Sequence, residues 1–231
     1  MIRIFDRYTG RTALRRVLAA NACALLLVAC GGGSGDGGIT EPPPPEIRSG
    51  EDDFSTNTIT RYTASSDFGT PWAIRDGRLI GDGTGIQSVL IRDGERLASG
   101  WVETRSSYAD DAGLVLGYLD NQNYYLFTFR DDSAPSPRDT RNLAVYQRIN
   151  GSFEEVWTRD ITWARGEERT FRLELRPGGT RLRVFMGGIL LAEGPVQPNG
   201  GRGFGLRHYG GDPAWQNRFD VLRWEISEDG N

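Results

Sequence analysis

Histidine and cysteine, the side chains that most often carry nucleophilic catalysis or bind transition metals, are scarce in this sequence of 231 residues. His208 is the only histidine, and both cysteines, Cys23 and Cys30, lie near the N-terminus. Zinc sites, Ser-His-Asp triads and Cys-His pairs need such residues grouped in one place. A phosphate-cradling loop needs lysine, which the chain lacks. The sequence therefore nominates no catalytic residue.

The charge balance argues against a nucleic-acid partner. The chain has 27 basic residues, all arginine, against 31 acidic ones. Five of the arginines precede residue 17, so removal of residues 1–29 leaves 22 arginines, 30 acids and a formal charge of about −8. A protein of this charge offers no basic surface for phosphates.

Residues 1–29 have the layout of a secretory signal peptide, with an arginine-rich start and an apolar run from Val17 to Ala29. Those 13 residues are fewer than the roughly 20 that span a bilayer as a helix. Leu27 to Cys30 resembles the lipobox of bacterial lipoproteins, which implies that Cys30 is acylated and becomes the first residue. Gly31 follows in place of Asp, and in similar lipoproteins this implies sorting to the outer membrane. We therefore expect an exported chain that contacts the membrane through its N-terminal lipid.

Residues 30–50 are expected to form a tether between the lipid and a folded domain. From Gly31 to Gly50 the sequence contains seven glycines and four consecutive prolines, with few apolar side chains to bury. Glycine-rich segments are flexible coils and proline runs are short stiff rods.

Residues 51–231 are expected to form one all-β domain, because short alternating apolar runs are separated by Gly, Asp, Asn and Pro throughout. The Gly178-Gly179 turn predicts a hairpin that sets Leu173 opposite Val184 on a buried face. The Gly187-Gly188 turn predicts a further strand with Val184 opposite Leu191. Other strands are predicted at 72–75, 78–81, 86–92, 98–105, 113–119, 124–130, 143–148, 153–159, 203–208 and 218–226. Asp76-Gly77 and Asn150-Gly151 predict hairpin turns between the strands that flank them. About twelve strands are too many for one flat sheet, so two packed antiparallel sheets are expected.

Several segments of this domain resemble the concanavalin A-like and laminin G-like jelly rolls. They are Asp52 to Phe54, Trp72 with Asp76 to Leu79, Gly113 to Tyr118 followed by Asp120 and Asn123 to Tyr125, and Phe219 to Val221. The resemblance implies a two-sheet antiparallel jelly-roll sandwich. It does not select an activity, because this superfamily includes lectins, adhesion modules, carbohydrate-binding modules and glycoside hydrolases.

The spacing of the acidic residues does not match that of the glycoside hydrolases in this superfamily. Glycosidases with this fold place their acids as Glu, any, Asp, any, any, Glu on a central strand. Glu51 and Asp53 begin such a string, but Thr56 stands at its end. Glu154 and Glu155 are neighbours and would point to opposite faces of a strand.

A binding site is easier to accommodate, because aromatic faces stack on sugars while polar groups bond their hydroxyls. Strand parity makes Glu103 and Arg207 candidates for the concave sheet, beside Trp101, with Tyr125, His208, Tyr209 and Trp215 as stacking surfaces. The alternative is that Trp101 and Tyr125 belong to the core and that Glu103 pairs with Arg207.

Similar jelly rolls sometimes hold a structural calcium near their termini, and the matching acids here are Asp52, Asp53 and Asp220. No other cofactor is expected. Our first hypothesis is a lipid-anchored, non-catalytic protein of the cell envelope that binds a glycan or another surface polymer. A glycoside-active hydrolase and a purely structural or adhesion module are the alternatives.

Overall fold

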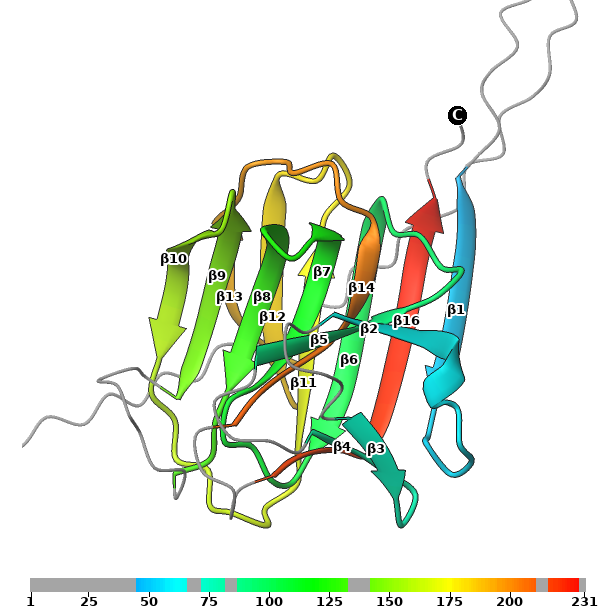
Figure 1. Ribbon diagram of the computed structural model, residues 1–231. Coiled ribbons are helices and arrows are strands. Elements are labelled where there is room, and N and C mark those ends of the chain that lie inside the picture. Colours follow the sequence, from blue (N-terminus) through cyan, green and yellow to red (C-terminus); the bar gives the residue numbers. More distant parts are fainter. Residues whose placement is uncertain (1–44, 66–71, 82–86, 133–141, 211–215, 229–231) are drawn as a thin grey trace, which may run out of the picture. The chain divides into compact units, whose positions relative to one another are not determined.

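The computed structural model describes residues 45–65, 72–81, 87–132, 142–210 and 216–228 (Figure 1). The predicted signal peptide, Cys30, most of the predicted tether and Trp215 lie outside these ranges. In these ranges sixteen strands form three antiparallel sheets, and one short 3-10 helix, η1 (Ile59–Arg61), lies between the first two strands of the chain. Within the described ranges, no helix has the length and apolar character needed to cross a bilayer.

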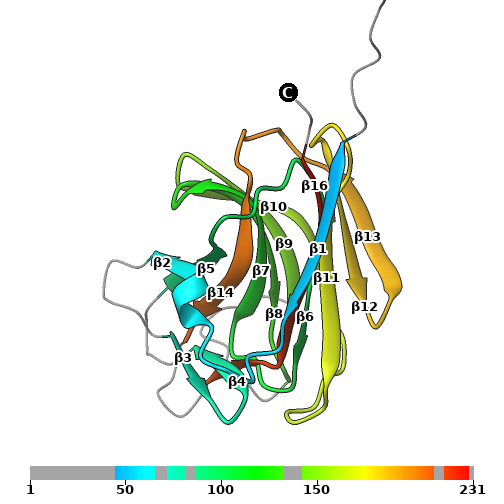
Figure 2. The ribbon, with the colours of Figure 1, turned by 90° about the vertical axis from the view of Figure 1, so that its right-hand side faces the viewer.

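Two large sheets form a sandwich, as the resemblance implied. The first has six strands in the order β1 (Glu46–Asp52), β16 (Val221–Glu228), β6 (Ser99–Ser106), β11 (Arg169–Leu175), β12 (Arg181–Met186) and β13 (Ile189–Pro195). The second has seven, in the order β10 (Ser152–Arg159), β9 (Leu143–Ile149), β8 (Asn123–Phe129), β7 (Ala112–Asp120), β14 (Gly203–Tyr209), β5 (Gln87–Arg92) and β2 (Tyr62–Ser65). The seven-stranded sheet lies in front in Figure 1, and Figure 2 shows the layers from the side.

The core fills the space between these sheets. Phe171 of β11 is fully buried and stacks on Phe129 of β8, with ring centroids 4.1 Å apart and planes 9° from parallel. Phe127 meets the edge of the same ring at 6.0 Å. Leu173 and Val184 are also buried, which confirms the predicted inward face of their hairpin. Burial of large aromatic side chains from both layers is the main attraction holding the sheets together.

The hairpin registers follow the turn chemistry. Leu173 pairs with Val184, as predicted, and the same register sets Leu175 opposite Leu182 and Phe171 opposite Met186. Asp76-Gly77 and Asn150-Gly151 adopt positive φ at both positions, as two-residue hairpin turns require.

One predicted pairing is wrong. A β-bulge between Val184 and Phe185 places Val184 opposite Ala192 and not Leu191. An extra residue on one strand shifts every later partner by one position, and the turn that sets the register does not encode it.

The predicted strand 218–226 is two strands in two sheets. β15 (Asn217–Phe219) pairs with β4 (Arg78–Gly81), which pairs with β3 (Trp72–Arg75) in a small third sheet. After Asp220, the chain enters β16 of the six-stranded sheet. Arg78 binds the Asp220 carboxylate at 2.5 Å. This contact holds the third sheet against the point where the chain changes sheets.

The folded part begins earlier than expected. β1 starts at Glu46, so residues 46–50, assigned to the tether from composition, pair with β16 at the edge of the six-stranded sheet. Most of their side chains are exposed. Edge pairing through backbone hydrogen bonds needs no apolar side chains, which is why composition did not reveal this strand.

Candidate functional site

The residues predicted to share a concave binding sheet lie on different sheets. Trp101 and Glu103 are on β6 of the six-stranded sheet, whereas Arg207 is on β14 of the seven-stranded sheet. The prediction of one site, and the alternative of a Glu103-Arg207 ion pair, are both wrong. Alternation along a strand indicates which side chains share a face, but it does not indicate which sheet the strand joins.

Glu103 belongs to a series of cross-strand ion pairs on the outer face of the six-stranded sheet, the face directed away from the core. Arg172 binds its carboxylate at 2.8 Å and Arg223 approaches it at 3.8 Å, while Arg223 also binds Glu51 at 2.7 Å. The Arg172 guanidinium lies 4.0 Å from the ring centroid of Trp101. The same arrangement continues to β13 through Glu174, Arg183 and Glu193. These side chains bind one another, so the face has the character of a solvated structural surface.

Arg207 has its own partner. Its guanidinium binds Asp111 at 2.7 Å and lies 5.4 Å from the ring centroid of Tyr209. The Arg207 side chain is almost completely buried, so this pair fixes the end of β7 against β14.

Tyr125 and His208 are interior residues and offer no stacking surface. The Tyr125 hydroxyl donates to the Gln197 carbonyl at 2.8 Å, and burial raises the pKa of this phenol. His208 is fully buried, with Nδ1 2.7 Å from the Asn217 amide nitrogen and its ring edge-on to Trp72. Tyr125 is therefore a core residue, as the alternative interpretation held, and His208 joins the main sandwich to the small third sheet.

The three acids nominated for calcium do not come together. Both oxygens of Asp52 accept hydrogen bonds, from the Phe54 amide, the Thr58 hydroxyl and the Tyr62 hydroxyl. Asp53 is exposed and accepts from Ser55, and Asp220 binds Arg78. Among the residues that the structure describes, no group of three or more His, Cys, Asp or Glu could hold a metal ion. The carboxylates stabilise local structure by hydrogen bonding to the protein itself.

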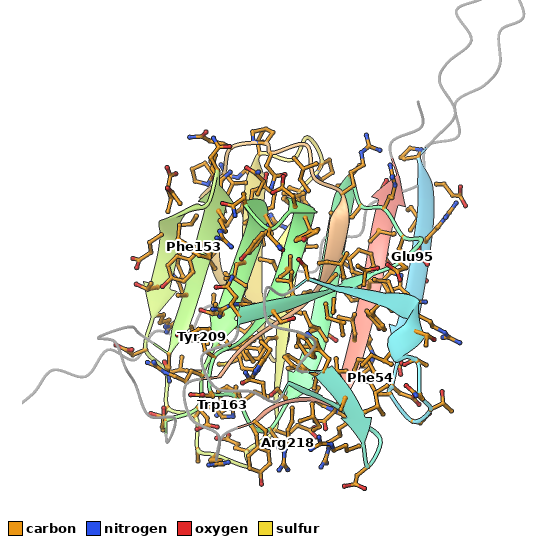
Figure 3. All side chains as sticks on the ribbon, viewed as in Figure 1. Phe54, Glu95, Phe153, Trp163, Tyr209 and Arg218 are labelled. Atoms are coloured by element: carbon orange, nitrogen blue, oxygen red, sulfur yellow. The ribbon has the colours of Figure 1, made fainter. Side chains whose placement is uncertain are left out.

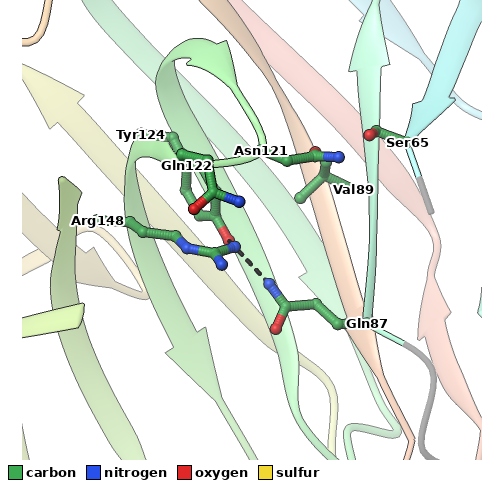
Figure 4. Close-up of a pocket in the computed structure, with 7 residues that line it drawn as sticks. All are labelled: Ser65, Gln87, Val89, Asn121, Gln122, Tyr124 and Arg148. Carbon is green, nitrogen blue, oxygen red and sulfur yellow. Dashed lines mark hydrogen bonds between the residues drawn. The ribbon is translucent and has the colours of Figure 1, made fainter. Parts of the chain in front are cut away.

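A pocket opens on the outer face of the seven-stranded sheet, and sequence analysis did not identify it (Figure 4). Its volume is about 180 Å³, smaller than the roughly 300–1,000 Å³ of sites that enclose drug-sized ligands. We call it the Tyr124 pocket, and the described residues that line it are Ser65, Gln87, Val89, Asn121, Gln122, Tyr124 and Arg148. These side chains come from β2, β5, β8, β9 and the turn between β7 and β8.

Tyr124 is at the centre of the hydrogen bonding in this pocket. Its hydroxyl accepts from the Gln87 amide at 2.8 Å and from the Arg148 guanidinium at 3.2 Å. Arg148 is itself held by the Gly151 carbonyl at 3.3 Å. The hairpin turn between β9 and β10 thus sets the position of the guanidinium.

A second hydrogen-bonded chain forms the other wall. The Tyr118 hydroxyl lies near Ser65 and donates to the Asn121 side-chain oxygen at 2.8 Å. Burial raises the pKa of Tyr118, and the nearby Ser65 hydroxyl offsets part of that increase. The phenol therefore stays neutral at physiological pH and holds the Asn121 amide in one orientation.

Aromatic rings continue from the pocket toward the edge of the sheet. The aromatic cluster contains Tyr118, Tyr124, Tyr146 and Phe153, with neighbouring ring centroids 5.9–6.3 Å apart. Phe153 lies on β10, is 44% exposed, and has the Arg148 guanidinium 4.8 Å from its centroid (Figure 3). Beside them, Val89, Val115 and Leu126 form a small apolar cluster on this face. The outer face thus presents a polar pocket next to an exposed ring.

The alternation of side chains along β8 gave part of the information needed to predict the Tyr124 pocket. In β8, Tyr125, Phe127 and Phe129 face the core, so Tyr124 must face outward. Both faces of β8 carry large apolar side chains, and the sequence alone does not show which of them is the interior.

The arrangement of the sheets matches known structures, although the sequence matches no family model and no curated protein. The chain superposes on the carbohydrate binding module CBM66 from Bacillus subtilis with a TM-score of 0.52 and 15% identity, over 71% of this chain and 92% of that one. The fold is a lectin-like jelly roll. The Lotus tetragonolobus seed lectin gives a TM-score of 0.51 and 14% identity, over 79% of this chain and 100% of the lectin.

The same jelly roll is found in a longer protein. The GH43 protein BlXynB from Bacillus licheniformis gives a TM-score of 0.59 and 14% identity, over 77% of this chain but 39% of that protein. At these identities the similarity establishes the fold and not the ligand.

Proposed function

We propose that this protein is a non-catalytic glycan-binding module and that its binding site is the Tyr124 pocket together with Phe153. The observation that carries the proposal is the combination of a polar pocket with an exposed aromatic ring on one face of a lectin-like jelly roll. Sugars present apolar ring faces and polar edges, and these two surfaces complement them. Solved structures of similar fold are named as a carbohydrate binding module and a lectin, which agrees with this assignment.

The pocket supports binding better than hydrolysis. Glycosidases of the retaining and inverting types place two carboxyl groups about 5–10 Å apart across the scissile bond. The described lining of the Tyr124 pocket contains no Asp or Glu. Its volume suits one sugar residue or the end of a chain, with the polymer continuing over Phe153.

We further propose that Cys30 is acylated and that the tether presents this face to polymers of the cell envelope, from the outer membrane. The support is the arginine-rich leader, the apolar run and the Leu27–Cys30 motif. In a bacterial host with two membranes, labelling with a radioactive fatty acid should mark the wild-type chain, and Cys30→Ser should remove the label. Equal labelling of both chains would contradict the anchor without affecting the glycan proposal.

The binding proposal is tested on a glycan array and by calorimetry with each retained glycan. Phe153→Ala removes the exposed ring, and loss of its contact should weaken binding about 3- to 10-fold. Trp101→Ala is the matched control, because it removes an aromatic ring from the outer face of the other sheet. Retention of no glycan, or weakening by Trp101→Ala and not by Phe153→Ala, would refute the proposed site.

A further inference from the structure

We infer that the Tyr124 pocket selects acidic sugars and that Arg148 binds the sugar carboxylate. This inference rests on the proposed function and goes beyond it by naming the chemical class of ligand. It depends on the N–H donors that Arg148 and Asn121 leave available in the pocket.

Arg148 differs from several other arginines of the two sheets. Arg172, Arg207 and Arg223 each bind a carboxylate within 4 Å. Arg148 contacts the Gly151 carbonyl, the Tyr124 hydroxyl and two aromatic rings, and within the described part of the chain it forms no ion pair. A guanidinium carries five N–H donors, and these two hydrogen bonds leave several of them available.

The acid Asp120, in the adjacent turn, is committed elsewhere. Its carboxylate accepts from the Gln122 backbone amide at 2.7 Å and from the Asn123 side chain at 2.9 Å. These bonds, with a smaller contribution from the Arg148 charge, lower the pKa of Asp120. Asp120 therefore stabilises its own turn, and it is not an ion-pair partner of Arg148.

Asn121 supplies a second donor, whereas Tyr124 is fully buried and positions its neighbours. The Tyr124 hydroxyl accepts hydrogen bonds from Gln87 and Arg148. Asn121 uses its side-chain oxygen for Tyr118, which leaves its N–H groups to donate. Arg148 and Asn121 thus bring N–H groups that are not used within the described part of the protein to one small pocket (Figure 4).

A carboxylate fits these donors because it is an acceptor only, and its two oxygens match the parallel N–H groups of a guanidinium. A neutral sugar brings hydroxyl groups, which accept hydrogen bonds but carry no charge for Arg148. The net charge of the chain is negative, so it gives no long-range attraction for anionic polymers. Selectivity must therefore come from contact within the pocket.

The test compares each acid with its neutral counterpart. Oligosaccharides of galacturonate, glucuronate and mannuronate are titrated beside their methyl esters, and sulfated oligosaccharides form a separate arm. The wild-type protein should prefer at least one acid over its ester about 10- to 100-fold, the range of a charge-assisted hydrogen-bonded pair. Arg148→Gln should remove this preference, so that the acid and its ester bind with similar affinity, and Arg148→Lys should retain part of the preference.

Arg172→Gln is the matched control, because it removes an arginine that stacks on an aromatic ring of the other sheet. It should leave the preference unchanged, and thermal unfolding of each variant checks that it folds. Equal binding of acids and esters, a preference for sulfate alone, or loss of the preference in Arg172→Gln would overturn the inference while the binding function stands. Failure to bind any acidic or neutral glycan would instead overturn the proposed function.

Discussion

Asp52 offers a sharp test of whether the acids at the ends of the jelly roll stabilise the protein by themselves or through a metal. It is 4% exposed and accepts three hydrogen bonds of 2.9–3.0 Å. One comes from the backbone of Phe54, a fully buried residue with φ of 54°, and the others come from the hydroxyls of Thr58 and Tyr62. Asp52 therefore joins the end of β1 to η1 and β2.

Asp52→Ala leaves three buried donors without their acceptor. Each hydrogen bond to a charged group contributes about 1.5–3 kcal/mol, and bonds that share one carboxylate are not additive. We expect a total loss of about 3–5 kcal/mol in the free energy of unfolding. For a domain of this size, each kcal/mol lowers the Tm by about 2–4 °C, so the Tm should fall by roughly 6–20 °C.

The assay is thermal unfolding followed by circular dichroism, in calcium and in EDTA. Asp53→Ala is the control, because its exposed carboxylate holds only the Ser55 turn, and it should give a much smaller shift. The Tm of the wild-type protein should be the same in both buffers. The reasoning fails if Asp52→Ala melts within about 2 °C of the wild type, or if calcium raises the wild-type Tm and Asp52→Ala abolishes the increase.

Two further predictions concern the core and alkaline pH. Phe171→Ala should lower the free energy of unfolding in urea by about 3–5 kcal/mol, because the Phe171 ring packs between Phe129, Phe127 and Trp163. The control is Ile189→Ala, which should change this free energy by less than about 0.5 kcal/mol because Ile189 is 70% exposed. Similar losses in the two variants would disprove the proposed packing. Burial, and then the Asp52 charge, raise the pKa of Tyr62. The folded state therefore keeps the phenol neutral while the unfolded state ionises near pH 10, so stability should be constant below about pH 9 and fall above pH 10. In urea unfolding from pH 8 to 11, the free energy of unfolding of Tyr62→Phe should fall less steeply with pH than that of the wild type. The chain has no lysine to titrate in this range. An equal slope in both proteins would contradict the role given to Tyr62.

The inferred ligand class depends on a contrast between the two outer faces. On the six-stranded sheet, arginines and acids alternate across neighbouring strands and satisfy one another. On the seven-stranded sheet, Arg148 lies among aromatic and amide side chains and not beside an acid. Arginine is therefore structural where it pairs with an acid, as Arg172 and Arg207 do, and available for a ligand at Arg148.

Local chemistry in the sequence was sufficient to predict the hairpins. Gly178-Gly179, Asp76-Gly77 and Asn150-Gly151 allow the backbone conformations of tight turns, so the registers on either side followed from a few adjacent residues. Alternating apolar residues then indicated the inward face of β11 and β12 and, with the resemblance to known jelly rolls, the fold class.

The site itself was decided by tertiary structure. Glu103 and Arg207 have similar local patterns, yet they lie on opposite sheets, because long-range strand order assigns each strand to a layer. Tyr124 and Tyr125 are adjacent and chemically alike. Only the packing of β8 against the six-stranded sheet buries Tyr125 in the core and turns Tyr124 toward Gln87 and Arg148. The sequence by itself determined the strands and their turns, whereas which side chains meet in a pocket depended on contacts between residues far apart in the chain.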